Sequence, residues 1–208
     1  MIRLGVLFPE HLNLNGDYGN LEVISRQLEW RRMASEIVAV GSPAELSSGL
    51  DFLLIGHGSS AAWASIDAEF RGLLATLKAL MAAGLPGMSV STGFEQMVRG
   101  SLFEKLTVNS LSSRTSKFVV EQDVEGEVLG YLNTDVDLPI IHRESNFLGT
   151  MLHGPILAKN PTLLEEMLLK ISANAGLELA PIYANEKAGL LADLVDKVWE
   201  LERDLASE

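Results

Sequence analysis

Short apolar segments alternate with helical segments along the first half of the chain, and this alternation restricts the possible folds more than any other feature. The segments expected to be strands are residues 2–8, 37–40, 52–55 and 88–90, and those expected to be helices are residues 21–32, 67–83 and 93–99. Strands that are separated by helices in this order form a parallel sheet with helices on its faces. We therefore expect an α/β fold with a mostly parallel sheet.

The second half of the chain has a different pattern. Further strands are predicted at residues 117–120, 127–132 and 146–152, a loop at residues 133–145, and helices at residues 160–175 and 186–205. The last helix places leucine and valine side chains on one face and acidic side chains on the other, so it either covers the sheet or docks a partner. We find no repeat and no linker, and we expect one domain over residues 1–208.

The charge balance and the lengths of the apolar runs argue against several classes of protein. The net charge of −12, from 16 basic and 28 acidic residues, would repel a phosphate backbone, so a nucleic-acid binder is not expected. No apolar run reaches the roughly 18 residues that a membrane-spanning helix needs. Residues 2–8 are too short for a secretory signal and are interpreted as a strand. These features predict a cytoplasmic protein without a membrane span.

The chain has no cysteine, which excludes disulfides, thiolate metal sites and cysteine nucleophiles together. The histidines at positions 11, 57, 142 and 153 lack the spacing of metal ligands, so we expect no metal site. The glycine-rich loops that bind nucleotide phosphates are also missing.

Three predicted strand ends carry residues that could do chemistry: Gly56-His57-Gly58, Ser91-Thr92-Gly93 and His153-Gly154. In an open α/β sheet, ligands bind beyond the carboxyl ends of the strands. If these three strands are neighbours, their loops converge on one crevice. Gly56-His57-Gly58 could then present backbone amides to an anion, although a tight turn would need the same residues.

Ser91 lies between a short strand and a helix, as the nucleophile does in a nucleophile elbow, where backbone amides at the helix start can stabilise an oxyanion. A hydrolase elbow has glycine two residues before the serine, and here that residue is Ser89. A serine that only caps the helix explains the same pattern. His153 is likewise either a structural or a chemical histidine. Asp17 and Asn20 could be a ligand pair, or an Asx turn followed by a cap for the helix at Leu21.

Two long segments carry a resemblance to a known family. Residues 12–20 read Leu-Asn-Leu-Asn-Gly-Asp-Tyr-Gly-Asn, and residues 149–161 read Gly-Thr-Met-Leu-His-Gly-Pro-Ile-Leu-Ala-Lys-Asn-Pro. Both resemble motifs of the cobyric-acid-synthase-like (CobQ-like) glutamine amidotransferases, and most of all those of GatD-type glutaminase subunits of lipid II isoglutaminyl synthase. The resemblance extends over residues 2–175 and implies the three-layer, flavodoxin-like class I glutamine amidotransferase fold.

The resemblance also implies an activity and a partner. Family members hydrolyse glutamine with a cysteine nucleophile and a histidine base, without a cofactor. The ammonia passes to a synthetase, which for the GatD type is a Mur-ligase-like, MurT-like subunit. That partner uses ATP to amidate D-glutamate in the peptidoglycan precursor.

By this resemblance, Ser91 occupies the position of the nucleophilic cysteine, and His153 occupies that of the base. Arg114 falls where the family has an arginine that contacts glutamine. Gly56 and Gly58 belong to a loop that reads Gly-Gly-Gly in the family and supplies an oxyanion amide.

The elbow reads Cys-Gly-Gly-Tyr-Gln in the family and Ser-Thr-Gly-Phe-Glu at residues 91–95 here. Thr92 therefore replaces a glycine, and Glu95 replaces a neutral amide that helps to hold glutamine. Ser60 stands where an acidic residue is usual. Because these residues and His57 depart from the family together, natural loss explains the serine better than an engineered single exchange.

These departures predict an impaired glutaminase, because a hydroxyl is a far poorer nucleophile than a thiolate. A loss of about 10³-fold or more, or some 4 kcal/mol, is expected from the nucleophile alone. The leading interpretation is a GatD-like pseudoenzyme subunit that survives as a binding or regulatory partner of a synthetase. A working glutaminase for peptidoglycan or corrinoid-type (cobalamin) amidation is the second. The third is a hydrolase that uses Ser91 and His153 with Asp17 or Glu144.

Overall fold

A computed structural model describes residues 1–183 and 186–207. Its main sheet has six strands in the order β2-β1-β3-β4-β8-β7, and the first five are parallel. Only β7 runs antiparallel, against β8. The strands are β1 (Ile2–Leu7), β2 (Ser35–Val40), β3 (Phe52–Ile55), β4 (Gly87–Val90), β7 (Ile141–Glu144) and β8 (Phe147–Thr150). The expected α/β fold with a mostly parallel sheet is confirmed.

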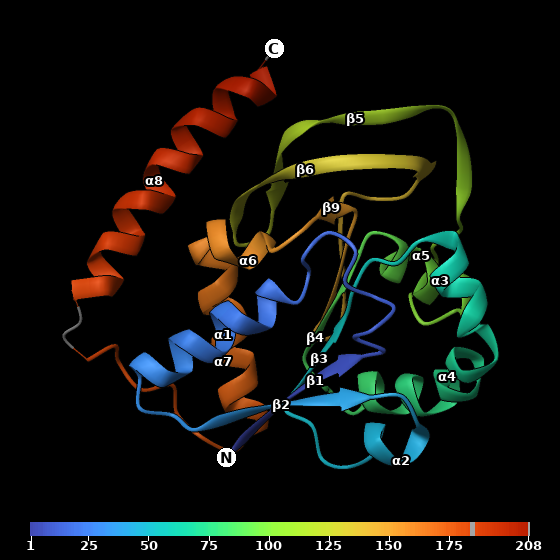
Figure 1. Ribbon diagram of the computed structural model, residues 1–208, viewed down its shortest axis with the longest axis horizontal. Helices are drawn as coiled ribbons and strands as arrows, with labels where there is room; N and C mark the ends of the chain where they lie inside the picture. Colours follow the sequence, from blue (N-terminus) through green and yellow to red (C-terminus); the bar gives the residue numbers. More distant parts are fainter. Residues whose placement is uncertain (184–185, 208) are drawn as a thin grey trace.

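Helices cover both faces of this sheet, as Figure 1 shows, with α1 and α7 on one side and α4 and α5 on the other. The helices are α1 (Gly19–Trp30), α2 (Pro43–Leu46), α3 (Ser60–Ser65), α4 (Asp67–Ala82), α5 (Thr92–Arg99), α6 (Ile156–Lys159) and α7 (Pro161–Asn174). The helix predicted at residues 67–83 is confirmed as α4, whose buried face consists of Phe70, Leu73, Leu77 and Met81.

The prediction that Asn20 caps the helix is wrong. It lies inside α1, not before it, and its buried side chain does not cap the helix. Its Oδ1 accepts a hydrogen bond from the Leu157 N–H at 3.0 Å, and its Nδ2 donates to the Gly154 carbonyl at 3.2 Å. Asn20 therefore ties α1 to the segment that carries His153.

A second sheet lies over the carboxyl end of the first. It consists of β5 (Asn109–Asp123), β6 (Gly126–Asp137) and β9 (Leu152–His153), all antiparallel. The loop predicted at residues 133–145 is wrong, because β6 continues to Asp137 and β7 follows. The prediction failed because residues 133–145 carry many polar side chains, which are typical of loops. In the structure most of these residues lie on strands with one solvent-facing side, where polar side chains are tolerated and the backbone hydrogen bonds form the strand.

The last helix, α8 (Glu186–Ser207), lies against the β5–β6 hairpin and α6 rather than on the six-stranded sheet (Figure 1). Lys159 Nζ and Glu202 Oε2 are 2.6 Å apart, and Arg203 pairs with Glu127. The Trp199 indole donates to the Lys159 carbonyl at 2.5 Å. None of the described α8 residues is buried, and four leucines of this helix are at least about half exposed: Leu190, Leu194, Leu201 and Leu205.

Candidate active site

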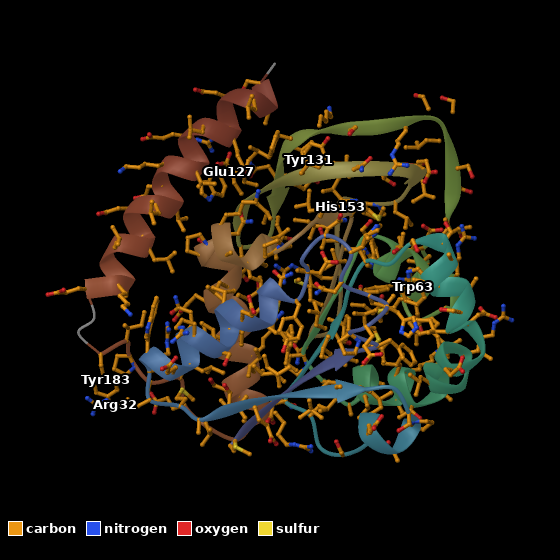
Figure 2. All side chains as sticks on the ribbon, viewed as in Figure 1. Arg32, Trp63, Glu127, Tyr131, His153 and Tyr183 are labelled. Carbon is orange, nitrogen blue, oxygen red and sulfur yellow. The ribbon has the colours of Figure 1, made fainter. Side chains whose placement is uncertain are left out.

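Three strand ends meet at one edge of the six-stranded sheet. Since β3, β4 and β8 are neighbours, the segments that follow them at Gly56, Ser91 and Met151 open on the same side. His153 lies in β9, which pairs with β6 through Tyr131, and Figure 2 shows His153 below Tyr131 of the hairpin. The structure thus brings the three predicted strand ends together.

Ser91 has the geometry of an elbow residue. Its φ of 51° and ψ of −115° lie outside the regions that residues with a Cβ prefer, and such strain is typical of functional sites. The side chain makes no helix-cap hydrogen bond, so the capping explanation fails. Its Oγ lies 3.0 Å from His153 Nε2 and 3.1 Å from His57 Nδ1.

Gly93 explains how the elbow can be so tight. A Cβ at this position would lie 2.6 Å from the Gly56 carbonyl oxygen and 2.7 Å from that of Ile55. Only glycine therefore lets the first turn of α5 approach the end of β3. This contact holds Ser91 beside the loop at residues 56–58.

Both nitrogens of the His153 ring make hydrogen bonds, which fix the orientation of the ring. Its Nε2 lies 2.9 Å from the carbonyl oxygen of Asn133, and its Nδ1 lies 2.5 Å from the Nδ2 of Asn15. A carbonyl oxygen can only accept, so Nε2 carries the proton, and Nδ1 accepts from Asn15. Burial lowers the pKa of His153; the Asn133 carbonyl opposes this effect, and the nearby charge of Arg114 adds to it. The neutral imidazole therefore points a donor, not a lone pair, toward Ser91.

His57 has the opposite orientation relative to the serine. Its Nδ1 lies 3.1 Å from Ser91 Oγ and accepts a long, 3.5 Å hydrogen bond from the Thr92 backbone N–H. Because an amide can only donate, Nδ1 is unprotonated. Burial, and then the charges of His153 and Arg114, lowers the pKa of His57 to about 4. In this network the acceptor for the Ser91 proton is His57.

The glycines of the 56–58 loop serve a close backbone approach. A Cβ on Gly56 would lie 2.0 Å from the Leu12 carbonyl oxygen, and one on Gly58 would lie 2.7 Å from a Leu12 methyl carbon. The Gly58 N–H, a candidate oxyanion donor, is bonded to Thr92 Oγ1 at 3.0 Å. Thr92 Oγ1 also accepts from the Trp63 indole at 2.9 Å and donates to the Gly58 carbonyl.

Asp17 is not a partner of the His153 ring. Its buried carboxylate accepts from two backbone amides, His57 N–H at 2.8 Å and Gly154 N–H at 3.1 Å. Burial raises its pKa to about 6, against the effect of these two hydrogen bonds. Glu144 lies 3.7 Å from His142 on β7. Asp17 therefore joins the two loops that carry the histidines, and neither residue completes a hydrolase triad.

A cavity of about 570 Å³ opens beside Ser91, and Arg114, Glu95 and Arg99 contribute to its wall. Arg114 lies in β5 where the register with β6 shifts, and its Nε donates to Asn133 Oδ1 at 2.6 Å. Glu95 accepts from Arg99 Nη2 at 2.7 Å. The negative charge predicted at Glu95 is thus balanced by a neighbouring cation.

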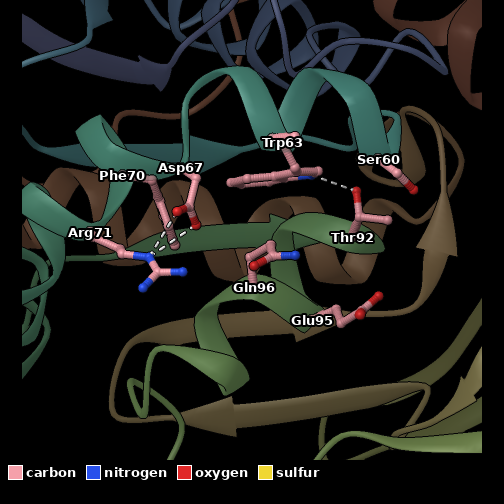
Figure 3. A pocket seen from close by; sticks show the side chains of 9 residues that line it. Ser60, Trp63, Asp67, Phe70, Arg71, Thr92, Glu95 and Gln96 are labelled. Carbon is pink, nitrogen blue, oxygen red and sulfur yellow. Dashed lines mark hydrogen bonds and ion pairs between the residues drawn. The ribbon is translucent and has the colours of Figure 1, made fainter.

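A second cavity of about 420 Å³ adjoins the first and shares Ser60, Thr92 and Glu95 with it. Figure 3 shows Trp63 and Phe70 on one side of it and the Asp67–Arg71 ion pair at its end. Ser60 therefore contributes to both cavities, at the position where an acidic residue was expected from the resemblance.

Two residues at the site had no role assigned from the sequence. Asn15 bonds the His153 ring, and Asn133 holds both that ring and Arg114. Both lie in segments that resemble the family. The hydrogen bond between Asn15 and His153, however, joins residues more than a hundred positions apart. Among residues 1–183 and 186–207, no cluster of three potential ligands could hold a metal ion. No helix within these ranges is long and apolar enough to cross a bilayer.

The fold of this chain is similar to that of the glutamine amidotransferases. No family model matches the sequence. The chain is similar to the glutamine-hydrolysing lipid II isoglutaminyl synthase subunit GatD of Staphylococcus aureus (strain N315), with 24% identity over 220 residues. That alignment covers 89% of this chain and 90% of GatD.

Solved structures agree on the fold. The glutaminase domain of Trypanosoma brucei CTPS with bound acivicin matches with a TM-score of 0.54 and 12% identity, over 90% of this chain and 99% of that domain. A glutamine amidotransferase from Thermotoga maritima matches with a TM-score of 0.53 and 11% identity, over 99% of this chain and 94% of that one. The resemblance found in the sequence is therefore confirmed.

Proposed function

We propose that this chain is a GatD-like glutamine amidotransferase subunit whose own glutaminase step is impaired or lost. The observation that carries the proposal is the 3.0 Å contact between Ser91 Oγ and His153 Nε2 at a strained elbow. It keeps the geometry of a nucleophile and its histidine while a hydroxyl takes the place of a thiol.

The hydrogen bonds support the loss of activity as strongly as the residue change does. A thiolate works beside a protonated imidazole, because the ion pair itself is the reactive state. A serine hydroxyl must instead give its proton to a base during attack. His153 Nε2 already carries a proton and donates it toward the Asn133 carbonyl, so it offers serine no base. The same argument counts against a Ser-His hydrolase that uses His153 as its base, since a carboxamide rather than a carboxylate contacts the other nitrogen of that ring.

The partner follows from the similarity to GatD, which is a subunit of an isoglutaminyl synthase. We propose that residues 1–208 form one domain that associates with a Mur-ligase-like synthetase acting on lipid II. The exposed leucines of α8 are the surface offered to that partner: Leu190, Leu194, Leu201 and Leu205. Exposed apolar stripes of this kind are typical of protein interfaces.

The catalytic part is tested by measuring glutamate and ammonia release from glutamine, with the chain alone and in complex with a synthetase encoded beside it. The proposal predicts release at the rate of the blank in both cases. Turnover by the unmodified chain at about 1 s⁻¹ or faster, in the range usual for enzymes, would show that serine serves as a working nucleophile and would refute the proposal.

The partner is tested by co-purification of the synthetase with the chain. Replacing both Leu194 and Leu201 with glutamate should abolish co-purification, because two charges would be buried at the contact. The matched control is Leu169→Glu on α7, where an exposed leucine outside α8 is changed. Equal recovery of the synthetase with both variants, or no recovery with the unmodified chain, would contradict the proposed surface.

A further inference from the structure

The side chain of His57 occupies the place where an elbow enzyme polarises its substrate. In that geometry the oxygen of the attacked carbonyl is held by the N–H of the residue after the nucleophile and by an N–H from a neighbouring loop. In this chain those groups are the N–H of Thr92, which follows Ser91, and the N–H of Gly58 in the loop after β3.

Both donors are already engaged inside the protein. The Thr92 N–H points to His57 Nδ1, and the Gly58 N–H points to Thr92 Oγ1. The same His57 nitrogen lies 3.1 Å from Ser91 Oγ. A ring atom in contact with both the nucleophile and the first oxyanion donor fills the space that a reacting carbonyl oxygen would need.

We propose that His57 is an internal plug of the oxyanion site, which closes the pocket over Ser91 to any acyl group. The inference deepens the proposed function, on which it rests for the role of Ser91. It assigns the closure of the oxyanion site to His57, a residue other than Ser91. His57 is a positioning residue in this account, because it acts on the donors rather than on a substrate.

Several contacts hold the plug in place. The backbone N–H of His57 donates to the buried carboxylate of Asp17, so the loop cannot swing freely. The ring packs beside His153, with 4.8 Å between centroids. Arg114, which lines the same cavity, keeps a positive charge near both rings and disfavours a second one.

Thr92 is the second part of the block. Its hydroxyl accepts from Gly58 and Trp63, and its one proton has two acceptors within reach, the Gly58 carbonyl at 2.9 Å and His57 Nδ1 at 3.1 Å, so its hydrogen-bonding capacity is filled. The Gly58 N–H would have to leave this arrangement before it could stabilise an oxyanion. Removal of His57 therefore frees one donor of the two.

A boronic acid tests the plug without glutamine. The serine oxygen adds to trigonal boron, its proton goes to solvent, and the resulting tetrahedral anion places an oxygen in the oxyanion site. We would titrate phenylboronic acid into the unmodified full-length chain, His57→Gly, His57→Ala and His57→Gly with Ser91→Ala, and follow boron by ¹¹B NMR. The matched control is His11→Ala, because His11 is exposed and lies outside the site.

The plug predicts that both single His57 variants bind phenylboronic acid at least about tenfold more tightly than the unmodified chain, since one freed oxyanion donor is worth this much or more. The Ser91→Ala exchange should abolish the gain, and His11→Ala should change nothing. Equal affinity of the unmodified chain and the His57 variants would overturn the proposal, as would a gain that survives without Ser91.

A second measurement does not depend on whether the variants fold. Nitrogen-15 shifts of the histidines in the unmodified chain report which ring nitrogen carries the proton. The plug requires an unprotonated Nδ1 on His57 at neutral pH. A proton on Nδ1 would overturn it. If no synthetase co-purifies with the unmodified chain while the boronate results hold, the proposed subunit function fails and the plug stands.

Discussion

The carbonyl oxygen of Asn133 accepts a hydrogen bond from Nε2 of His153 at 2.9 Å. This single contact determines which nitrogen of the imidazole carries the proton, because the carbonyl has nothing to donate. Asn133 lies in β6 and His153 in β9, and the two strands are paired antiparallel. The hairpin thus controls the chemistry of the residue that the fold places beside Ser91.

The first prediction concerns this tautomer. Both site histidines should be neutral at pH 7 with the proton on Nε2, since His153 donates to a carbonyl and His57 accepts from an amide. Two-dimensional ¹H–¹⁵N spectra distinguish the tautomers, and His11→Ala and His142→Ala would assign the remaining signals. A lone pair on His153 Nε2 would mean that the ring is poised as a base, against this account.

The second prediction is a pH dependence of stability. The pKa of His57 is about 4 in the folded chain, whereas an unfolded histidine titrates near 6.5. The folded state therefore binds fewer protons between these values, and this contribution to stability is full above pH 6.5 and is lost as the pH falls through about 4. Urea unfolding at pH 7 and pH 4.5 should show a larger loss for the unmodified chain than for His57→Gln. The raised pKa of Asp17 has the opposite effect on the pH dependence of stability. Because both chains contain Asp17, its contribution cancels when their losses are compared. A larger loss in the variant would refute the assignment.

The third prediction concerns Asp17. Replacement with alanine leaves the N–H groups of His57 and Gly154 buried without an acceptor, so the free energy of unfolding should fall by about 2–4 kcal/mol. Asp17→Asn retains one acceptor and should lose less. The His57 and His153 signals should shift together in both variants, because one carboxylate joins both loops. Unchanged stability in Asp17→Ala would contradict this role.

The fourth prediction tests the elbow packing. Gly93→Ala should reduce the free energy of unfolding by about 1–3 kcal/mol or more, because its Cβ would press on two backbone carbonyl oxygens. Gly72→Ala is the matched control: it lies in α4 with nothing within 4 Å of the new Cβ. It should be neutral or gain up to about 1 kcal/mol from helix propensity. Similar losses in the two variants would argue against the close contact between α5 and the end of β3.

The sequence predicted the sheet because its strands are short apolar runs and its helices have clear apolar stripes, both of which are local signals. It also located Ser91 and His153 by their place after strands. Asn20 was misjudged because a cap and a buried tertiary contact use the same side chain, and only the fold decides between them. The strand at residues 133–137 was missed because its polar residues lie on a hairpin.

The hydrogen bonds at the site could not be predicted in the same way. The contact of Asn15 with His153 joins residues from the two ends of the chain, and no pattern of residue types encodes it. The position of His57 was noticed as a departure from the family's glycines. Its contact with the Thr92 amide depends on the backbone of the elbow and becomes visible only in three dimensions.

The most direct test of the central claim, that Ser91 and His57 together silence the site, compares glutamate release by four chains in complex with the synthetase: unmodified, Ser91→Cys, His57→Gly and the double variant. The account predicts that only the double variant rises clearly above the blank, by about 10²-fold or more over either single variant. Ser91→Cys alone as active as the double variant would show that His57 blocks nothing, and an unmodified chain as active as the double variant would contradict the loss of the glutaminase.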